Sequence, residues 1–376
     1  MQKSRVAILT GIYPPDSGGP ATFAVSFSNF ALKVGFDTDV VSYTDGDSRE
    51  TKSGNHSVRL ISRKWGLIRR TCLAVFHIVR IFLGKSKVIA NGLFVETYLA
   101  SLLTKGKYVV KIPGDIVWER AVNSKRTNLE VREFQSSGLN LRYRIFRYLF
   151  TKSIMKADVV IVPSTLLFEL CLGWGVPKER IHLIYNSVDI DFFLPSEFLE
   201  REFDCIVVNR LVAWKNVKEV IHACHTLNLS LLIVGDGPES DALRSLAKQL
   251  GSKVTFAGNV SKETLLKKLQ SAKFYILNST ADATAYSLLE ARSCGLIAVA
   301  NIKTGASEVI NDQIDGILTG ATTQSEIQTV LSGLIEKNVS ELQTMSKNAR
   351  ISTVNSFNKE VNFGLILDLV ATSYAQ

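Results

Sequence analysis

The sequence predicts an α/β protein made of two doubly wound domains, and three observations lead to this fold class. Short, continuously apolar runs alternate with longer amphipathic stretches, which is typical of parallel strands covered by helices on both faces. The alternation starts again after about residue 200. The chain also has 376 residues, more than a single hydrophobic core usually serves.

The first domain is expected over residues 1–195. Helices are predicted at amphipathic stretches such as Ala21–Val34 and Leu141–Lys156. Between them lie five apolar runs, each short enough for a buried strand. These predicted strands are Val6–Thr10, Thr38–Ser42, Val88–Ala90, Tyr108–Ile112 and Val159–Pro163.

The second domain is expected over residues 196–355, because Pro195 and a run of charges interrupt the pattern near Val188–Glu200. Its predicted strands are Cys205–Val208, Ser230–Val234, Val254–Ala257, Phe274–Leu277 and Ile297–Ala300. Its predicted helices cover residues 215–226, 238–250, 261–271, 286–293 and 305–311. The last segment, 356–376, contains an amphipathic helix that we expect to pack back on the first domain.

Cysteine usage and hydropathy indicate a cytoplasmic protein. A peripheral association with the inner face of the cytoplasmic membrane is compatible with this location. The five cysteines are odd in number and scattered, which is not typical of a disulfide framework or a zinc site. His222 and His225 lack further ligands nearby, so we predict no metal and no cofactor. No secretory signal is recognisable. The most hydrophobic stretch, Cys72–Leu83, is too short and too polar to span a bilayer.

Positive charge is concentrated in residues 51–156, which carry a net charge of +16, against −7 for the remainder and +9 for the whole chain. Basic and aromatic or aliphatic residues alternate there, around Trp65 and again over Arg142–Tyr148. This mixture suits the surface of an anionic membrane. A solvated basic face is the alternative. Nucleic acid is disfavoured because no binding motif accompanies the charge.

Ligand-binding residues are expected after strands, because open α/β sheets bind ligands beyond the carboxyl ends of their strands. Asp282 and Glu290 follow the predicted strand Phe274–Leu277 and flank a small-residue loop that opens a helix. A carboxylate accepts hydrogen bonds from pairs of sugar hydroxyls, and a helix N-terminus attracts phosphate. This segment therefore suits the recognition of a nucleotide sugar.

Two further loops carry candidate binding residues. Gly18 and Gly19 follow the first strand, where they let the backbone approach a ligand. Arg210 and Lys215 follow the first strand of the second half, from which they can converge on a diphosphate. A plain turn and ordinary surface cations are the respective alternatives. Gly235–Pro238 is interpreted mainly as a structural turn between a strand and a helix.

Taken together, these residues resemble the retaining glycosyltransferases of family 4, which have the GT-B fold of two Rossmann-like domains facing a central cleft. The resemblance covers nearly the whole chain, and its motifs follow the family's order. The motifs are Tyr13–Pro15 with Gly18–Gly19, Ala157–Ser164, Ile184–Asp189 with Phe193, Asn209–Leu211 with Lys215, Val234–Pro238, Phe256–Gly258, Asp282–Glu290 with Ala291 and Gly295, and Gly305 with Glu308 and Gly316.

The resemblance implies a role for each matching residue. Arg210 and Lys215 bind the donor diphosphate, and Glu290 accepts hydrogen bonds from the ribose. Asp282, where the family usually has Glu, contacts the transferred sugar. The remaining implied donor contacts come from the backbone of Ala285, Tyr286 and Ser287 for the phosphate, from Gly258 and Val260 near the base, and from Gly18 and Gly19 at the donor phosphate or the acceptor.

The chain departs from the family pattern in the loop Pro113–Glu119, where many members carry a His. Asp115 is the expected substitute there, orienting the acceptor hydroxyl or balancing developing charge. A helix cap is the alternative role for Asp115. Arg210, Lys215, Asp282 and Asp115 are thus the predicted catalytic residues.

The predicted function is metal-independent, retaining transfer of a sugar from a UDP- or GDP-sugar to an acceptor hydroxyl. The expected acceptor is lipid-linked or a polysaccharide, in the synthesis of a bacterial surface glycan such as lipopolysaccharide O-antigen, capsule or exopolysaccharide. Two alternatives are a nucleotide-sugar epimerase and a catalytically weak sugar-binding scaffold of the same fold. A nicotinamide enzyme is disfavoured because no dinucleotide fingerprint follows the first strand.

Overall fold

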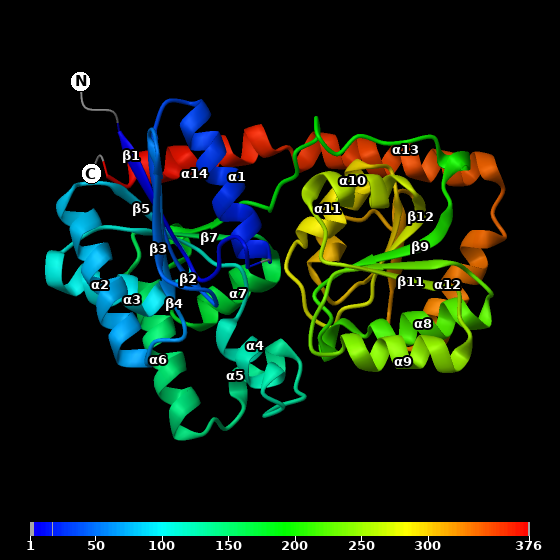
Figure 1. Cartoon of the computed structure of the whole chain (residues 1–376), viewed down its shortest axis with the longest axis horizontal. Helices are drawn as coiled ribbons and strands as arrows, with labels where there is room; N and C mark the ends of the chain where they lie inside the picture. Colours follow the sequence, from blue (N-terminus) through cyan, green and yellow to red (C-terminus); the bar gives the residue numbers. More distant parts are fainter. Residues whose placement is uncertain (1–3, 17, 375–376) are drawn as a thin grey trace. The chain divides into compact units, whose positions relative to one another are not determined.

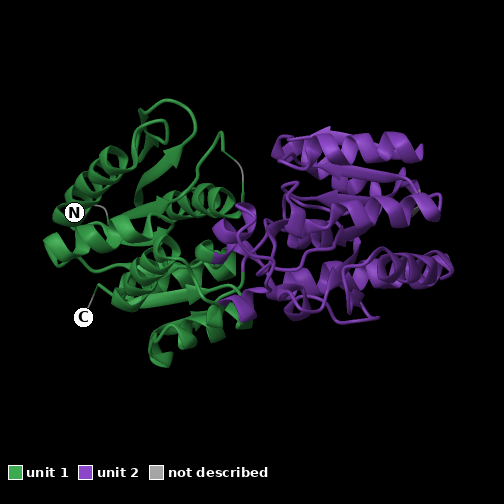
Figure 2. Cartoon of the chain, turned by 90° about the horizontal axis from the view of Figure 1, so that it is seen from below, with its two compact units in different colours: residues 1–117, 135–185, 360–376 green, residues 118–134, 186–359 purple. Residues whose placement is uncertain are grey.

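The computed structural model describes residues 4–16 and 18–374, which divide into two compact α/β units. Unit 1 comprises residues 1–117, 135–185 and 360–376, and unit 2 comprises residues 118–134 and 186–359 (Figure 2). The chain thus leaves the first unit at 185/186, earlier than the predicted domain boundary, and the short segment 118–134 is grouped with unit 2.

Unit 1 is built on a sheet in the order β3-β4-β2-β1-β5-β6-β7-β8, parallel except for the β3–β4 pair. Its strands are β1 (Arg5–Thr10), β2 (Asp37–Thr44), β3 (Arg49–Ser53), β4 (His56–Ser62), β5 (Lys87–Asn91), β6 (Val109–Lys111), β7 (Val159–Val162) and β8 (Ile181–Leu183). The prediction lacks β3, β4 and β8. The five residues of β3 are all exposed at the sheet edge, so no apolar run marks it.

Most helices of unit 1 follow its strands in the chain, whereas the C-terminal helix comes after unit 2 (Figure 1). They are α1 (Gly19–Lys33), α2 (Leu67–Leu83), α3 (Phe94–Thr104), α6 (Leu141–Lys156) and α7 (Thr165–Gly173), while α4 (Ile116–Asn123), α5 (Val131–Ser136) and α14 (Lys359–Thr372) each contain a unit boundary. In α14, the ring of Phe363 packs edge-on against Phe23, Phe27 and Phe30 of α1. The C-terminal helix therefore completes the core of unit 1.

Unit 2 contains a fully parallel sheet in the order β11-β10-β9-β12-β13-β14. Its strands are β9 (Phe203–Val208), β10 (Leu231–Val234), β11 (Val254–Gly258), β12 (Ala272–Leu277), β13 (Ile297–Asn301) and β14 (Gly316–Thr319). Its helices are α8 (Val217–Thr226), α9 (Ser240–Leu250), α10 (Lys262–Gln270), α11 (Tyr286–Ser293), α12 (Gln324–Ile335) and α13 (Val339–Ser356).

The predicted fold class of two α/β domains with parallel sheets is confirmed. The order of the second sheet places β9 next to β12 at its centre. These strands precede the two loops in which the sequence predicts donor-binding residues. Because neighbouring parallel strands end at the same edge, both loops emerge side by side there.

Candidate functional site

The loops that follow β9 and β12 are joined by reciprocal hydrogen bonds. The side-chain amide of Asn216 donates to the carbonyl of Asn278 (3.1 Å), and that of Asn278 donates to the carbonyl of Asn216 (3.2 Å). The backbone N–H of Thr280 donates to the carbonyl of Trp214 (3.1 Å). The sheet topology and these bonds together hold the Arg210–Lys215 loop against the Asp282 loop.

Lys215 and Asp282 form an ion pair between these two loops. The Lys215 Nζ lies 2.6 Å from the Asp282 Oδ2, and the two side chains are only 9% and 14% exposed. The ammonium also lies 4.4 Å from the ring centroid of Trp214, and the face of an aromatic ring attracts a cation. Two predicted catalytic residues, 67 positions apart, are therefore joined in one ion pair.

The Asp282 loop is held in place by two other segments. The Gly305 N–H donates to the carbonyl of Asp282 (2.8 Å), and a Cβ on Gly305 would lie 2.7 Å from the carbonyl carbon of Ala283. The buried side chain of Asn186 donates to the carbonyl of Thr284 (2.6 Å). The sequence places Asn186 and Gly305 in family motifs but does not predict these roles, because their contacts join distant parts of the chain.

The start of α11 presents its backbone N–H groups without a side-chain cap. Ala285 occupies the N-cap position and offers no side-chain acceptor. The first N–H groups of a helix have no partner inside it and carry positive dipole character. Ser287 Oγ is engaged with the buried Tyr275 hydroxyl (2.7 Å), so its backbone is the part open to a ligand. Ala285, Tyr286 and Ser287 therefore lie where an anion would be bound.

Glu290, one turn further along α11, is a half-buried carboxylate with a perturbed pKa. Desolvation raises the pKa of Glu290 to about 7, and the charge of Lys262 lowers it in part. The pKa of Tyr275 is raised by burial and by the charges of Asp282 and Glu290, which places both carboxylates near the same ring. Buried groups with shifted pKa values are concentrated at functional sites.

Arg210, Gly258 and Val260 all lie at the carboxyl ends of strands in the sheet of unit 2: Arg210 follows β9, Gly258 ends β11 and Val260 comes after it. Arg210 is exposed, but its loop is rigid, because Leu211 exchanges backbone hydrogen bonds with Asp236 and Glu239. A Cβ on Gly235 would lie 2.0 Å from the Asn209 carbonyl oxygen, so Gly235 serves close packing, as expected. Gly258, with φ +65°, accepts from the Gly235 N–H and leads into Val260.

Asp115 lies in unit 1 with both carboxylate oxygens engaged. Oδ1 accepts from the N–H of Val117 (2.9 Å) at the start of α4, and Oδ2 accepts from the side chain of Gln135 (2.9 Å). Arg147 lies 3.9 Å from Oδ2, and the Asp115 side chain is 1% exposed. These contacts match the helix-cap alternative, and a catalytic role for Asp115 stays a prediction.

Gly18 and Gly19 are in unit 1, at the start of α1, away from the donor residues in the sequence. Gly18 is the N-cap residue with φ +145°, and the first turn has no side-chain cap. Next to this loop, Arg63 forms ion pairs with Asp16 and Asp45. The following residue, Lys64, forms an ion pair with Asp47. The basic cluster around Trp65 is therefore partly neutralised.

Neither a metal cluster nor a membrane-spanning helix is found in the part of the chain that the structure describes. No group of three or more His, Cys, Asp or Glu side chains there could hold a metal ion. No helix there combines the length and apolar character needed to cross a bilayer.

Two family models match adjoining parts of the chain. The model described as Glycosyltransferase Family 4 matches residues 17–192, and the model described as Glycosyl transferases group 1 matches residues 189–352. The second match contains the predicted donor-binding residues of unit 2, from Arg210 to Glu290. The first contains Gly18, Gly19 and Asp115.

The chain is similar to several known glycosyltransferases. It is 29% identical over 211 residues to an uncharacterized glycosyltransferase of Methanocaldococcus jannaschii, covering 51% of this chain and 54% of that protein. It thus spans about half the length of such archaeal relatives. It is 26% identical over 228 residues to the N-acetyl-alpha-D-glucosaminyl L-malate synthase of Bacillus anthracis, covering 55% of this chain and 58% of that protein.

A solved structure shares the fold over almost the whole chain. The Anabaena protein HepE, in complex with UDP and glucose, superposes with a TM-score of 0.78 at 18% identity, covering 98% of this chain and 100% of that one. With the two parallel α/β units described above, this similarity shows the GT-B fold.

Proposed function

We propose, from the premise that the chain belongs to the family 4 glycosyltransferases, that it transfers a sugar from a UDP- or GDP-sugar to an acceptor hydroxyl with retention at the anomeric carbon. One observation carries the proposal: the buried Lys215–Asp282 ion pair joins the loop after β9 to the loop that opens α11, ahead of Glu290. This arrangement offers a cation, free N–H groups and two carboxylates to one nucleotide sugar.

The chemical task of these residues is to stabilise the departing nucleoside diphosphate. Negative charge grows on the diphosphate as the glycosidic bond breaks, and fixed positive potential lowers the energy of that state. Lys215, Arg210 and the start of α11 supply this potential. The ion pair with Asp282 holds the Lys215 ammonium in one place, so little reorganisation is needed when the charge develops.

Asp282 and Glu290 recognise hydroxyl groups in this proposal and transfer no proton. Asp282 accepts from the transferred sugar, and Glu290 accepts from the ribose. Asp is one methylene shorter than the Glu usual at position 282 in the family. The sugar must therefore approach the loop more closely or be contacted through water, which makes this position a determinant of sugar specificity.

The experiment that tests the proposal begins with a thermal-shift screen of UDP, GDP and their sugars. A ligand that binds only the folded protein raises its melting temperature. The sugar that binds is then supplied with candidate acceptors, and the anomeric configuration of the product is determined by NMR. An inverted product would refute retention. EDTA should leave the rate unchanged, and a loss restored by Mg²⁺ or Mn²⁺ would refute metal independence.

Two alternative functions give different products in the same assay. An epimerase would convert the nucleotide sugar without any acceptor. A catalytically weak scaffold would bind the nucleotide sugar and release no diphosphate. Slow hydrolysis of the donor in the absence of acceptor would favour the transferase, because water then replaces the acceptor hydroxyl.

The proposed acceptor is lipid-linked or a polysaccharide at the membrane surface, and α6 supports this proposal. Leu141, Ile145 and Tyr148 follow one another at helical spacing and are 71%, 53% and 60% exposed. Arg142 and Arg144 lie beside them and are exposed, and α6 has no acidic residue. An apolar stripe with flanking arginines suits insertion at the surface of an anionic membrane.

Vesicle sedimentation tests this surface. Binding to vesicles containing phosphatidylglycerol should exceed binding to phosphatidylcholine vesicles and should weaken with salt. Ile145→Ser should weaken it further, whereas Ile314→Ser, which changes an isoleucine that is 60% exposed in unit 2, should not. Absence of binding at any salt concentration would favour an acceptor that is free in solution.

A further inference from the structure

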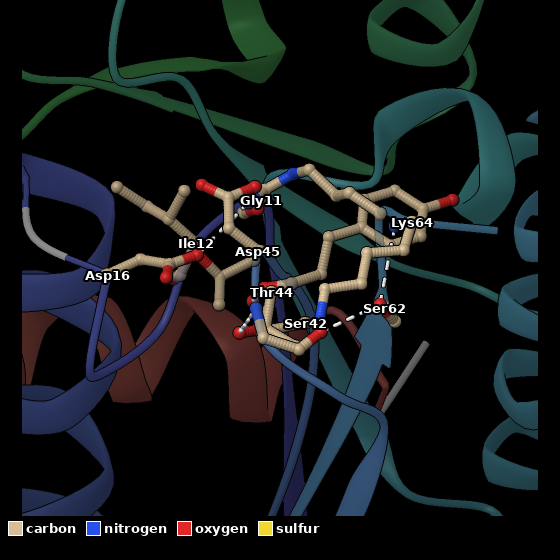
Figure 3. A network of polar contacts seen from close by, with 12 residues as sticks. Gly11, Ile12, Asp16, Ser42, Thr44, Asp45, Ser62 and Lys64 are labelled. Atoms are coloured by element: carbon tan, nitrogen blue, oxygen red, sulfur yellow. Dashed lines mark hydrogen bonds and ion pairs between the residues drawn. The ribbon is translucent and has the colours of Figure 1, made fainter.

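One arginine joins three segments of unit 1 around the loop that follows β1. Arg63 directly follows β4, and its Nη1 donates to Asp16 Oδ2 (3.0 Å) and to Asp45 Oδ1 (2.8 Å). Its Nη2 donates to the carbonyl of Gly11. Figure 3 shows Gly11 and Asp16 of the loop close to Asp45, which comes just after β2. A single guanidinium therefore connects the loop after β1 to the ends of β2 and β4.

The contacts within the loop count for more than the contact to Asp45. The Asp16 side chain is 14% exposed, whereas that of Asp45 is 78% exposed. An ion pair in water contributes little, because solvent screens it and ordering costs entropy. The hydrogen bonds that the charged guanidinium donates to the half-buried Asp16 carboxylate and to the Gly11 carbonyl are stronger than such an exposed pair. Arg63 therefore acts mainly on Gly11 and Asp16.

The backbone of Arg63 is itself fixed, so the guanidinium has little freedom. Its N–H donates to the carbonyl of Thr44 (2.8 Å), and its carbonyl accepts from Arg70 Nη1 (3.4 Å). The preceding residue, Ser62, donates through its hydroxyl to the carbonyl of Gly46 (2.7 Å). The ends of β2 and β4 thus form a rigid base for the side chain, and Figure 3 shows Thr44 and Ser62 within this network.

The constraint continues from Gly11 to Gly18 through Ile12. The Thr10 hydroxyl donates to the carbonyl of Ile12 (3.1 Å), and a Cβ on Gly18 would lie 2.8 Å from Ile12 Cδ1. On the other side, a Cβ on Gly92 would lie 2.1 Å from the Gly11 nitrogen. The loop is therefore held between Gly92 and Arg63, and Ile12 contacts the glycine that opens α1.

We propose that Arg63 is a positioning residue, which holds Gly11–Asp16 in the conformation that brings Gly18 and Gly19 to the substrate. The inference rests on the proposed function, in which these glycines meet the donor phosphate or the acceptor. Because two carboxylates neutralise Arg63, it is not available to bind an anionic ligand directly. Small displacements of positioning groups reduce rates strongly, by up to roughly a hundredfold for 1 Å.

Arg63→Lys is the informative variant, because it keeps the charge but cannot hold two carboxylates and a carbonyl with one fork. Lys64→Ala is the matched control: Lys64 is the adjacent cation, 63% exposed, and its ion pair with Asp47 is exposed on both sides. Hydrogen exchange is measured first, without substrate. We expect faster exchange over Gly11–Asp16 in Arg63→Lys, and no change in Lys64→Ala or in the amides of unit 2.

Kinetics then connect the loop to catalysis. Arg63→Lys should lower kcat/KM for transfer by on the order of tenfold to a hundredfold. The dissociation constant for UDP or GDP, whichever binds, should change much less than kcat/KM, because Lys215 and Glu290 are unchanged. In a double-mutant cycle, adding Asp16→Ala to Arg63→Lys should cost little more, since both act through the same contact.

The outcomes separate the inference from the proposed function. Unchanged exchange over Gly11–Asp16, or wild-type kcat/KM in Arg63→Lys, overturns the positioning role. A parallel loss of nucleotide binding, transfer and melting temperature also overturns it, since that indicates a general loss of folded protein. Failure of the wild type to transfer any sugar, with exchange altered as expected, overturns the proposed function and with it the link from Arg63 to catalysis.

Discussion

Glu290 should make the binding of a nucleotide sugar depend on pH near neutrality. Desolvation raises the pKa of this carboxyl from its ordinary 4.5 to about 7, against a smaller opposing effect of Lys262. Only the ionised carboxylate accepts hydrogen bonds from both ribose hydroxyls. The ionised fraction is about nine-tenths one pH unit above the pKa and about one-tenth one unit below it, so affinity should fall about tenfold between those two pH values.

Isothermal titration calorimetry with a nucleotide sugar measures this change. A nucleotide sugar is preferred to UDP because a terminal phosphate titrates near the same pH. Repeating the titration near neutrality in buffers of different ionisation enthalpy should reveal release of about half a proton for each sugar bound. Glu290→Gln preserves the shape and removes the charge, so its affinity should be lower and independent of pH.

Two results would refute the reasoning. One is equal affinity of the wild type above and below neutrality. The other is a tenfold change that persists in Glu290→Gln, which would assign the titration to another group. Stability gives an independent check. Because the folded pKa of Glu290 exceeds its ordinary value, this group's contribution to stability declines as pH rises from about 4.5 to about 7. Glu290→Gln should therefore raise the melting temperature most above neutrality.

Three further predictions concern the other site residues. Arg210→Ala and Lys215→Ala should each lower kcat/KM by roughly 10²–10³, measured as initial rates, and near-wild-type turnover in both would refute their role at the diphosphate. Asp115→Ala should lower stability by about 1–3 kcal/mol in denaturant unfolding, while Asp115→Asn keeps the cap acceptor, loses the acceptor for Gln135 and should cost less. A large loss of turnover in Asp115→Asn at unchanged stability would instead support catalysis by Asp115. Gly305→Ala should weaken nucleotide-sugar binding by displacing Ala283, and unchanged affinity in calorimetry would contradict this.

The central strands of both sheets could be predicted from the sequence because they are continuously apolar. The runs Val6–Thr10 and Phe274–Leu277 lie within β1 and β12. The edge strand β3 could not be predicted, because its residues are polar and exposed and it is defined by pairing with β4. The predicted helix at residues 305–311 is a short 3₁₀ turn, Gly305–Glu308, since Gly305 is drawn against the Asp282 loop.

For the site, the sequence could identify residues but not their partners. Asp282 and Lys215 can be predicted from loops after strands, yet their ion pair depends on β9 and β12 being neighbours in the sheet. Arg63 and Asp16 are 47 positions apart, and no local sequence pattern in either segment predicts their contact. By contrast, the cap formed by Asp115 lies two residues from Val117, so a local pattern is enough to suggest it as an alternative.

The position of α14 determines how this protein can be divided and recombined. The two stretches that border the crossings between units, near Val188 and Asn358, are bridged by backbone hydrogen bonds, and Lys359 is paired with Asp189 (2.7 Å). Beyond this bridge, Phe363 fills the aromatic core of α1. A chimaera that takes its second half, residues 186–359, from a relative should therefore keep residues 360–376 together with the first half.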